Sequence, residues 1–234
     1  EILNKGGNAV DAAVATALAV GVVQPAGSGL GGGGFAVVVT ADGDSHVLDF
    51  RETAPEAATR DMYVNAENPE ASRLGGLAIG VPGEAAGLAV LHERWGSLPM
   101  REVAAPAVRL ARDGFLVEPH LASALKSSGL AGPALSMGLF GEVEVPTVGT
   151  HVKRVKLAST IESFAETGGK SLQQGPIASD IVAAAAEAGG ILTEKDLADY
   201  STRDRKPIVG QYKGWTVITM PPPSSGGVVL MQIL

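Results

Sequence analysis

Near its start the chain carries an almost unbroken apolar run, residues 12–23, in which Thr16 is the one polar side chain. A helix that spans a membrane needs about 20 apolar residues, so this run is too short to cross a bilayer. The run has the length of a signal-peptide core and follows Lys5, but Asp11 stands directly at its start. We therefore predict a helix that is capped by Asn8 or Asp11, is apolar on nearly every face, and lies buried in the middle of a layered fold.

The composition indicates a folded, closely packed chain. Hydrophobic residues make up 45% of the 234 residues, which excludes an intrinsically disordered chain, and this length suits one large domain or two small ones. The 31 glycines and 4% aromatic residues indicate that backbone segments approach each other closely. The net charge of −7 argues against a general nucleic-acid binder, which needs basic stripes. The chain has no cysteine, so disulfides, Cys nucleophiles, thiolate metal sites and iron–sulfur clusters are excluded.

The expected elements are mixed α and β, without the regular alternation of a βαβ fold. The turn at 41–44 separates two alternating segments and predicts a hairpin. Residues 129–149 are rich in Gly and Pro and predict an irregular surface segment. Strands are expected at 35–40, 45–51 and 77–81, with a further pair around Lys213 and Gly214 within 208–219. Helices are expected at 84–95, 100–113, 119–127, 157–166 and 176–188, and from the cap Thr193 to 197.

The glycine-rich segment 27–34 contains the G-x-G-x-x-G pattern of dinucleotide-binding loops. Such a loop needs a strand before it and a helix after it, so that the helix N-terminus faces the pyrophosphate. Here the order is inverted, because a helix is expected before the glycines and a strand after them. We interpret these glycines as positions where two backbones approach closely or where a tight loop needs positive φ.

Other short motifs are incomplete. Residues 169–171 read Gly-Lys-Ser and match the end of the phosphate-binding loop motif, but Phe164 occupies the position of its first glycine. His92 and the glutamate after it open like a zinc-protease motif, but Gly96 occupies the position of the second histidine. No serine lies in a G-x-S-x-G pattern. The sequence therefore predicts neither a metal nor a cofactor.

A charged triplet closes the second strand of the expected hairpin, where residues 49–52 read Asp-Phe-Arg-Glu. Loops at strand ends commonly carry substrate contacts, and an arginine there can hold a carboxylate with its fork of N–H donors. The alternative is a surface ion pair between Arg51 and Glu52. The residue types alone leave both interpretations open.

Six segments in order along the chain resemble the gamma-glutamyltranspeptidase family. One such match would be weak, but the ordered set extends over nearly the whole chain. The matching segments are 6–15, 31–35, 49–55, 81–84, 110–115 and 220–227.

The resemblance implies an α+β fold, the four-layer αββα sandwich of N-terminal-nucleophile (Ntn) hydrolases. Family members are made as a precursor that cuts itself into a large and a small subunit. The new N-terminal Thr of the small subunit is the nucleophile, and its own α-amino group is thought to act as the base. The reaction splits a γ-glutamyl amide, typically in glutathione, through an acyl-enzyme, and water or an amino acid then takes the acyl group.

The chain matches most of the large subunit, as a single-domain fragment 1–234 truncated at both ends. It is expected to pair with a small subunit from the same precursor and to contain no catalytic residue, so Ser224 and Ser225 are not expected to be catalytic. The family arginine that binds the substrate α-carboxylate falls on Arg51. Related acylases on cephalosporin-type or oxamate-type amides, and a non-catalytic scaffold, remain alternatives. The compartment stays open, because a signal segment would precede Glu1.

Overall fold

The computed structural model describes residues 1–127 and 146–234, so most of the irregular segment expected at 129–149 lies outside the described residues. The architecture is α+β, as expected. The helices are α1 (Ala9–Val23), α2 (Glu84–Trp95), α3 (Met100–Asp113), α4 (Pro119–Ser127), α6 (Val155–Thr167), α7 (Pro176–Glu187), α8 (Glu194–Asp199) and α9 (Gly226–Ile233). Short 3-10 helices are η1 (Leu3–Lys5), η2 (Gly76–Ala78) and η3 (Lys170–Leu172). The strands are β1 (Gly34–Val39), β2 (Ser45–Phe50), β3 (Phe115–Leu116), β4 (His151–Val152), β5 (Arg203–Arg205), β6 (Ile208–Tyr212) and β7 (Trp215–Thr219).

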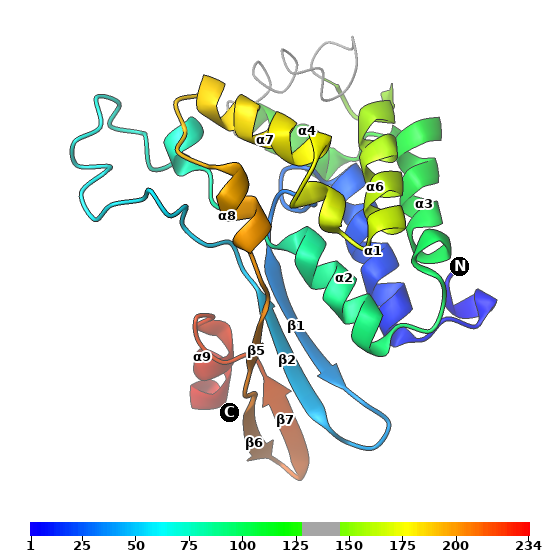
Figure 1. The fold of residues 1–234 in the computed structure, drawn as a ribbon. Coiled ribbons are helices and arrows are strands. Elements are labelled where there is room, and N and C mark those ends of the chain that lie inside the picture. The colour runs from blue at the N-terminus through cyan, green and yellow to red at the C-terminus, as the bar shows by residue number, and fades with distance from the viewer. Residues whose placement is uncertain (128–145) are drawn as a thin grey trace.

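The helices form a layer beside a small antiparallel sheet (Figure 1). α2 lies against β1 and β2, α1 packs against α2 and α3, and α6 packs against α3. The β6–β7 hairpin and α9 lie away from this layer, at the end where the chain finishes (Figure 1). Within the described ranges, no helix combines the length and the apolar character that crossing a membrane requires.

α1 forms because a capping box closes its first turn and most of its side chains are apolar. The Asn8 side chain accepts hydrogen bonds from first-turn N–H groups, and the Asp11 carboxylate accepts one from the Asn8 N–H at 2.9 Å. The helix buries Val14, Leu18 and Val22 in the main hydrophobic core. The predicted cap is therefore confirmed, and one face of the helix is buried as expected, whereas Ala13, Thr16 and Val20 on another face are exposed in this chain.

The sheet that carries the charged triplet has the order β1-β2-β5, with both pairings antiparallel. The hairpin expected from residues 35–51 is confirmed, and its register places Phe35 opposite Asp49. On the other edge of β2, Asp49 lies opposite Arg203 and Val47 lies opposite Arg205. The sheet thus brings basic residues from late in the chain beside the end of β2.

The strand expected at 77–81 is wrong. The segment contains η2 and makes one isolated bridge, between Thr53 and Val81. The N–H of Gly76 donates to a carbonyl at the C-terminal end of α7 at 2.9 Å, and a Cβ on Gly76 would lie 2.2 Å from the backbone nitrogen of Gly190. Because this backbone is held against the end of α7, it does not align along a neighbouring strand.

The remaining helix predictions agree closely with the structure. The helices expected at 84–95, 100–113 and 119–127 have the same bounds in the structure, and α6, α7 and α8 differ from expectation by one or two residues. The capping box at Thr193 and Asp196 is also present. The sequence reasoning missed α9 and the strands β3, β4 and β5. These strands have two or three residues each, too few to show a period, and exist only because partners distant in sequence pair with them.

Candidate functional site

Arg51 directly follows β2, at the point where the chain leaves the sheet. Its side chain is 60% exposed, and its Nε lies 3.5 Å from Oε2 of Glu52. The guanidinium lies over the ring of Phe35 on β1, 5.8 Å from the ring centroid. An exposed pair of this kind contributes about 1 kcal/mol or less. The Arg51 guanidinium is therefore available to a ligand.

Arg51 lines a cavity of about 730 Å³. The cavity is bounded by the glycine-rich loop 27–33, by Arg51, Glu52 and Glu84, and by apolar side chains of α1, α6 and α7. A volume of this order is typical of pockets that take a small molecule. A smaller hollow of about 250 Å³ lies between α3 and α6, but its arginines Arg101, Arg109 and Arg112 already pair with glutamates. The larger cavity is therefore the candidate site.

The glycine-rich loop forms one wall because its backbone must lie directly against other backbone. A Cβ on Gly33 would lie 2.6 Å from the carbonyl oxygen of Phe50, which is too close for any other residue type. The carbonyl of Gly32 accepts hydrogen bonds from the N–H groups of Gly83 and Glu84, both at 2.9 Å, at the start of α2. The loop thus joins the end of β2 to the N-terminus of α2. This confirms the interpretation of close backbone approach.

Glu84 places a buried carboxyl group in the cavity wall. The residue is 6% exposed, and burial raises the pKa of its carboxyl to about 7, with a further contribution from the negative charge of Glu52. A hydrogen bond from the backbone N–H of Gly29 stabilises the charged carboxylate and so lowers this pKa in part. A Cβ on Gly32 would lie within 4 Å of carboxylate oxygens of both glutamates, so the two groups flank the same part of the loop. Sequence reasoning missed Glu84, because nothing local signals its burial.

The raised pKa of Glu84 predicts a pH dependence of stability. Between the unfolded value of 4.5 and the folded value of about 7, the folded protein binds the proton more tightly, so stability falls as pH rises through this window. Glutamine mimics the neutral acid. In the complete protein, the Tm of Glu84→Gln should therefore fall less than the wild-type Tm between about pH 5 and about pH 8. Glu93→Gln, an exposed glutamate on the same helix, is the matched control. An equal pH response in the Glu84 variant and the wild type would contradict the assignment.

Arg154 is a second cation in the cavity wall, but its hydrogen bonds serve the fold. Its Nη1 donates to the carbonyls of Gly21 and Val22 at 2.8 and 3.0 Å, in the last turn of α1. Burial lowers the pKa of Arg154 to about 10, so the group remains a cation at neutral pH. A cation at a helix C-terminus is favourable because it opposes the partial negative charge there.

Among the described residues no group of three His, Asp or Glu side chains is arranged to hold a metal ion.

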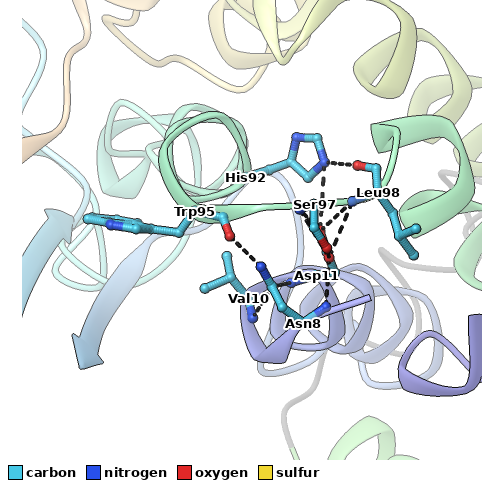
Figure 2. Close-up of polar contacts among 7 residues, drawn as sticks. All are labelled: Asn8, Val10, Asp11, His92, Trp95, Ser97 and Leu98. Atoms are coloured by element: carbon cyan, nitrogen blue, oxygen red, sulfur yellow. Dashed lines mark hydrogen bonds and ion pairs between the residues drawn. The ribbon is translucent and has the colours of Figure 1, made fainter. Parts of the chain in front are cut away.

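A serine, a histidine and an aspartate meet at the start of α1, but their contacts are not those of a catalytic triad (Figure 2). The Ser97 hydroxyl donates directly to Asp11 at 2.6 Å. His92 Nε2 donates to the carbonyl of Leu98 at 2.7 Å and lies 3.9 Å from Asp11. A triad needs the histidine between the serine and the acid. This cluster instead holds the connection between α2 and α3 on the N-terminus of α1.

Comparison with known proteins decides the family. The family model described as Gamma-glutamyltranspeptidase matches residues 1–234. The chain belongs to this family. It is 42% identical over 236 residues to glutathione hydrolase 2 of Arabidopsis thaliana, covering 100% of this chain and 40% of that protein. It is 41% identical over 241 residues to the glutathione hydrolase proenzyme of Escherichia coli (strain K12), covering 100% of this chain and 42% of that protein.

The solved structures agree with the family assignment. The gamma-glutamyltranspeptidase of Helicobacter pylori superposes with a TM-score of 0.92 at 38% sequence identity, covering 99% of this chain and 68% of that chain. The α+β Ntn-hydrolase fold implied by the resemblance is therefore confirmed. The chain spans about two fifths of the length of the curated relatives named above. Those relatives are named as glutathione hydrolases, and one of them is named as a proenzyme.

Proposed function

We propose that this chain is the large-subunit part, as one domain over residues 1–234, of a γ-glutamyltransferase or glutathione hydrolase, in which Arg51 binds the α-carboxylate of the γ-glutamyl group. The observation that supports this role most is that the Arg51 guanidinium is exposed in the cavity and has no short ion pair among the described residues. It is exposed at the wall of a cavity of about 730 Å³, and its contact with Glu52 is a long one of 3.5 Å. Arg154, the other arginine of that cavity, is already bound to backbone carbonyls.

In this proposal the chain supplies binding and the rest of the precursor supplies the chemistry. The guanidinium of Arg51 donates two N–H groups to the α-carboxylate, which fixes the far end of the substrate and so places the γ-carbonyl. A Thr at the N-terminus of the small subunit attacks that carbonyl, and its own amino group takes the proton of the hydroxyl. The C–N bond of the γ-glutamyl amide then breaks, the amine leaves with that proton, and the γ-glutamyl group remains on Thr as an acyl-enzyme. Water or an amino acid then releases the acyl group. No residue of this chain forms a covalent bond to substrate.

The proposal predicts both processing and turnover in the complete protein. The purified protein should separate into two polypeptides on a denaturing gel, and sequencing of the smaller one should begin at Thr. The processed protein should release glutamate from glutathione and transfer the γ-glutamyl group to an added dipeptide. An isolated chain 1–234 is the control and should show neither activity. An unprocessed, inactive complete protein would favour the scaffold alternative, and turnover restricted to amides without an α-carboxylate would favour a related acylase.

A further inference from the structure

The backbone of Arg51 is held on both sides by buried side chains. Its N–H donates to Oδ1 of Asp49 at 3.0 Å, and its carbonyl accepts a hydrogen bond from the hydroxyl of Tyr200 at 2.8 Å. Asp49 is 5% exposed and Tyr200 is 9% exposed, so water has little access to either bond. A strand end in a loop is ordinarily free to change direction. Here both polar groups of the Arg51 backbone are fixed.

The second oxygen of Asp49 is occupied by another arginine. Oδ2 accepts from Nε and Nη2 of Arg205 at 3.0 and 2.8 Å. Arg205 lies on β5, and the antiparallel register of β2 and β5 brings it beside Asp49. Because the Asp49 carboxylate is already paired with the guanidinium of Arg205, it does not compete for the guanidinium of Arg51, two residues further along the chain.

Tyr200 is itself fixed by the elements around it. The residue follows α8 directly, and its carbonyl accepts a hydrogen bond from the side chain of Gln173 at 2.9 Å. Its hydroxyl packs so closely on Gly83 that a Cβ there would lie 2.0 Å from the oxygen. Burial raises the pKa of Tyr200 to about 12, with further contributions from Asp49 and Glu52, so the phenol keeps its proton and remains a donor to Arg51 at neutral pH.

We propose that Asp49 and Tyr200 are positioning residues, which hold the backbone of Arg51 so that its guanidinium faces the substrate carboxylate, and that Arg205 keeps Asp49 from pairing with that guanidinium. This inference rests on the proposed function above, since it assigns these residues to the binding step of that reaction. Their effect passes through Arg51, so they should change substrate affinity and leave the rate of bond cleavage nearly unchanged.

The test compares matched variants of the complete protein with γ-glutamyl-p-nitroanilide as substrate. Tyr200→Phe removes one sheltered hydrogen bond to Arg51, and Asp49→Asn keeps one acceptor oxygen but loses the ion pair with Arg205 that orients it. Each should raise KM about threefold to tenfold and change kcat by less than about twofold. Tyr63→Phe is the control for the tyrosine, because the Tyr63 hydroxyl also donates to a backbone carbonyl, that of Leu77 at 3.0 Å. Asp204→Asn is the control for the aspartate, because Asp204 lies on β5 beside Arg205 but pairs with Arg94 of α2. Neither control should change KM.

A double-mutant cycle with Arg51→Ala separates this inference from the proposed function. In the Arg51→Ala background, Tyr200→Phe and Asp49→Asn should have no further effect on KM. If Arg51→Ala alone leaves kcat/KM unchanged, the proposed function fails. Two results would overturn the positioning role while Arg51→Ala still lowers kcat/KM. In the first, Tyr200→Phe and Asp49→Asn leave KM unchanged. In the second, each has its full effect on KM in the Arg51→Ala background as well. A fall in Tm without a change in KM also overturns it, and Tyr200→Phe decides alone if Asp49→Asn does not fold.

Discussion

Replacing Arg51 with alanine in the complete protein should lower kcat/KM for γ-glutamyl-p-nitroanilide by roughly 30-fold to several thousandfold. This range corresponds to about 2–5 kcal/mol, the usual cost of leaving a desolvated charge without its partner. The exposed guanidinium becomes desolvated only when the substrate carboxylate fills the cavity beside it, so the loss should appear mainly in KM. Arg51→Lys should recover part of the activity, because it keeps the charge but loses the fork of N–H donors.

Two controls make the Arg51 result specific. Arg60→Ala removes an arginine whose side chain is 95% exposed and should leave kcat/KM unchanged. The substrate analogue 4-aminobutyryl-p-nitroanilide keeps the amine but lacks the α-carboxylate, so wild type and Arg51→Ala should hydrolyse it at similarly low rates. Wild-type kcat/KM on the γ-glutamyl substrate in the Arg51→Ala variant would show that the carboxylate is bound elsewhere.

Replacing Asp11 with alanine should destabilise the protein by about 3 kcal/mol or more, since several donors to a buried carboxylate lose their acceptor together. Asp11 is 0% exposed and accepts hydrogen bonds from the N–H groups of Asn8 and Ser97 and from the Ser97 hydroxyl (Figure 2). A loss of this size should lower Tm by about 6–12 °C in a cooperatively unfolding domain of this length. Asp196→Ala, which removes the corresponding residue of the less buried capping box of α8, should cost only about 1 kcal/mol.

The Asp11 effect should depend on pH in a defined direction. Burial alone would raise the pKa of its carboxyl, but the hydrogen bonds from Ser97, Asn8 and Leu98 outweigh burial and lower it below the ordinary 3.8. The stabilising contribution is therefore complete above the unfolded pKa and is lost as pH falls through the lower, folded pKa. Denaturation curves of wild type and Asp11→Ala should converge at acid pH. A difference in stability that stays constant down to about pH 2 would contradict this account.

The candidate site was only partly predictable. Arg51 was singled out because an arginine stood at the end of a predictable strand, and the family resemblance favoured its role in binding a carboxylate. Glu84 and Tyr200 were missed. The burial of Glu84 depends on the glycine-rich loop folding over the start of α2, and Tyr200 reaches Arg51 from 149 positions later in the chain. No local pattern encodes either contact.

The sequence by itself determined the elements whose signals are local. The capping residues and apolar run of α1, the helices α2, α3 and α4, and the two hairpins all follow from hydrogen bonds and periodicity within a few residues, and those forces act wherever the segment lies. Only the tertiary structure decided the rest. Residues 77–81 leave the strand conformation because the end of α7 holds their backbone, and β5 exists because β2 pairs with it. The contact between Tyr200 and Arg51 is likewise non-local. Asp49 and Tyr200 are buried from water, so their polar atoms need partners within the protein, and the backbone N–H and carbonyl of Arg51 supply them.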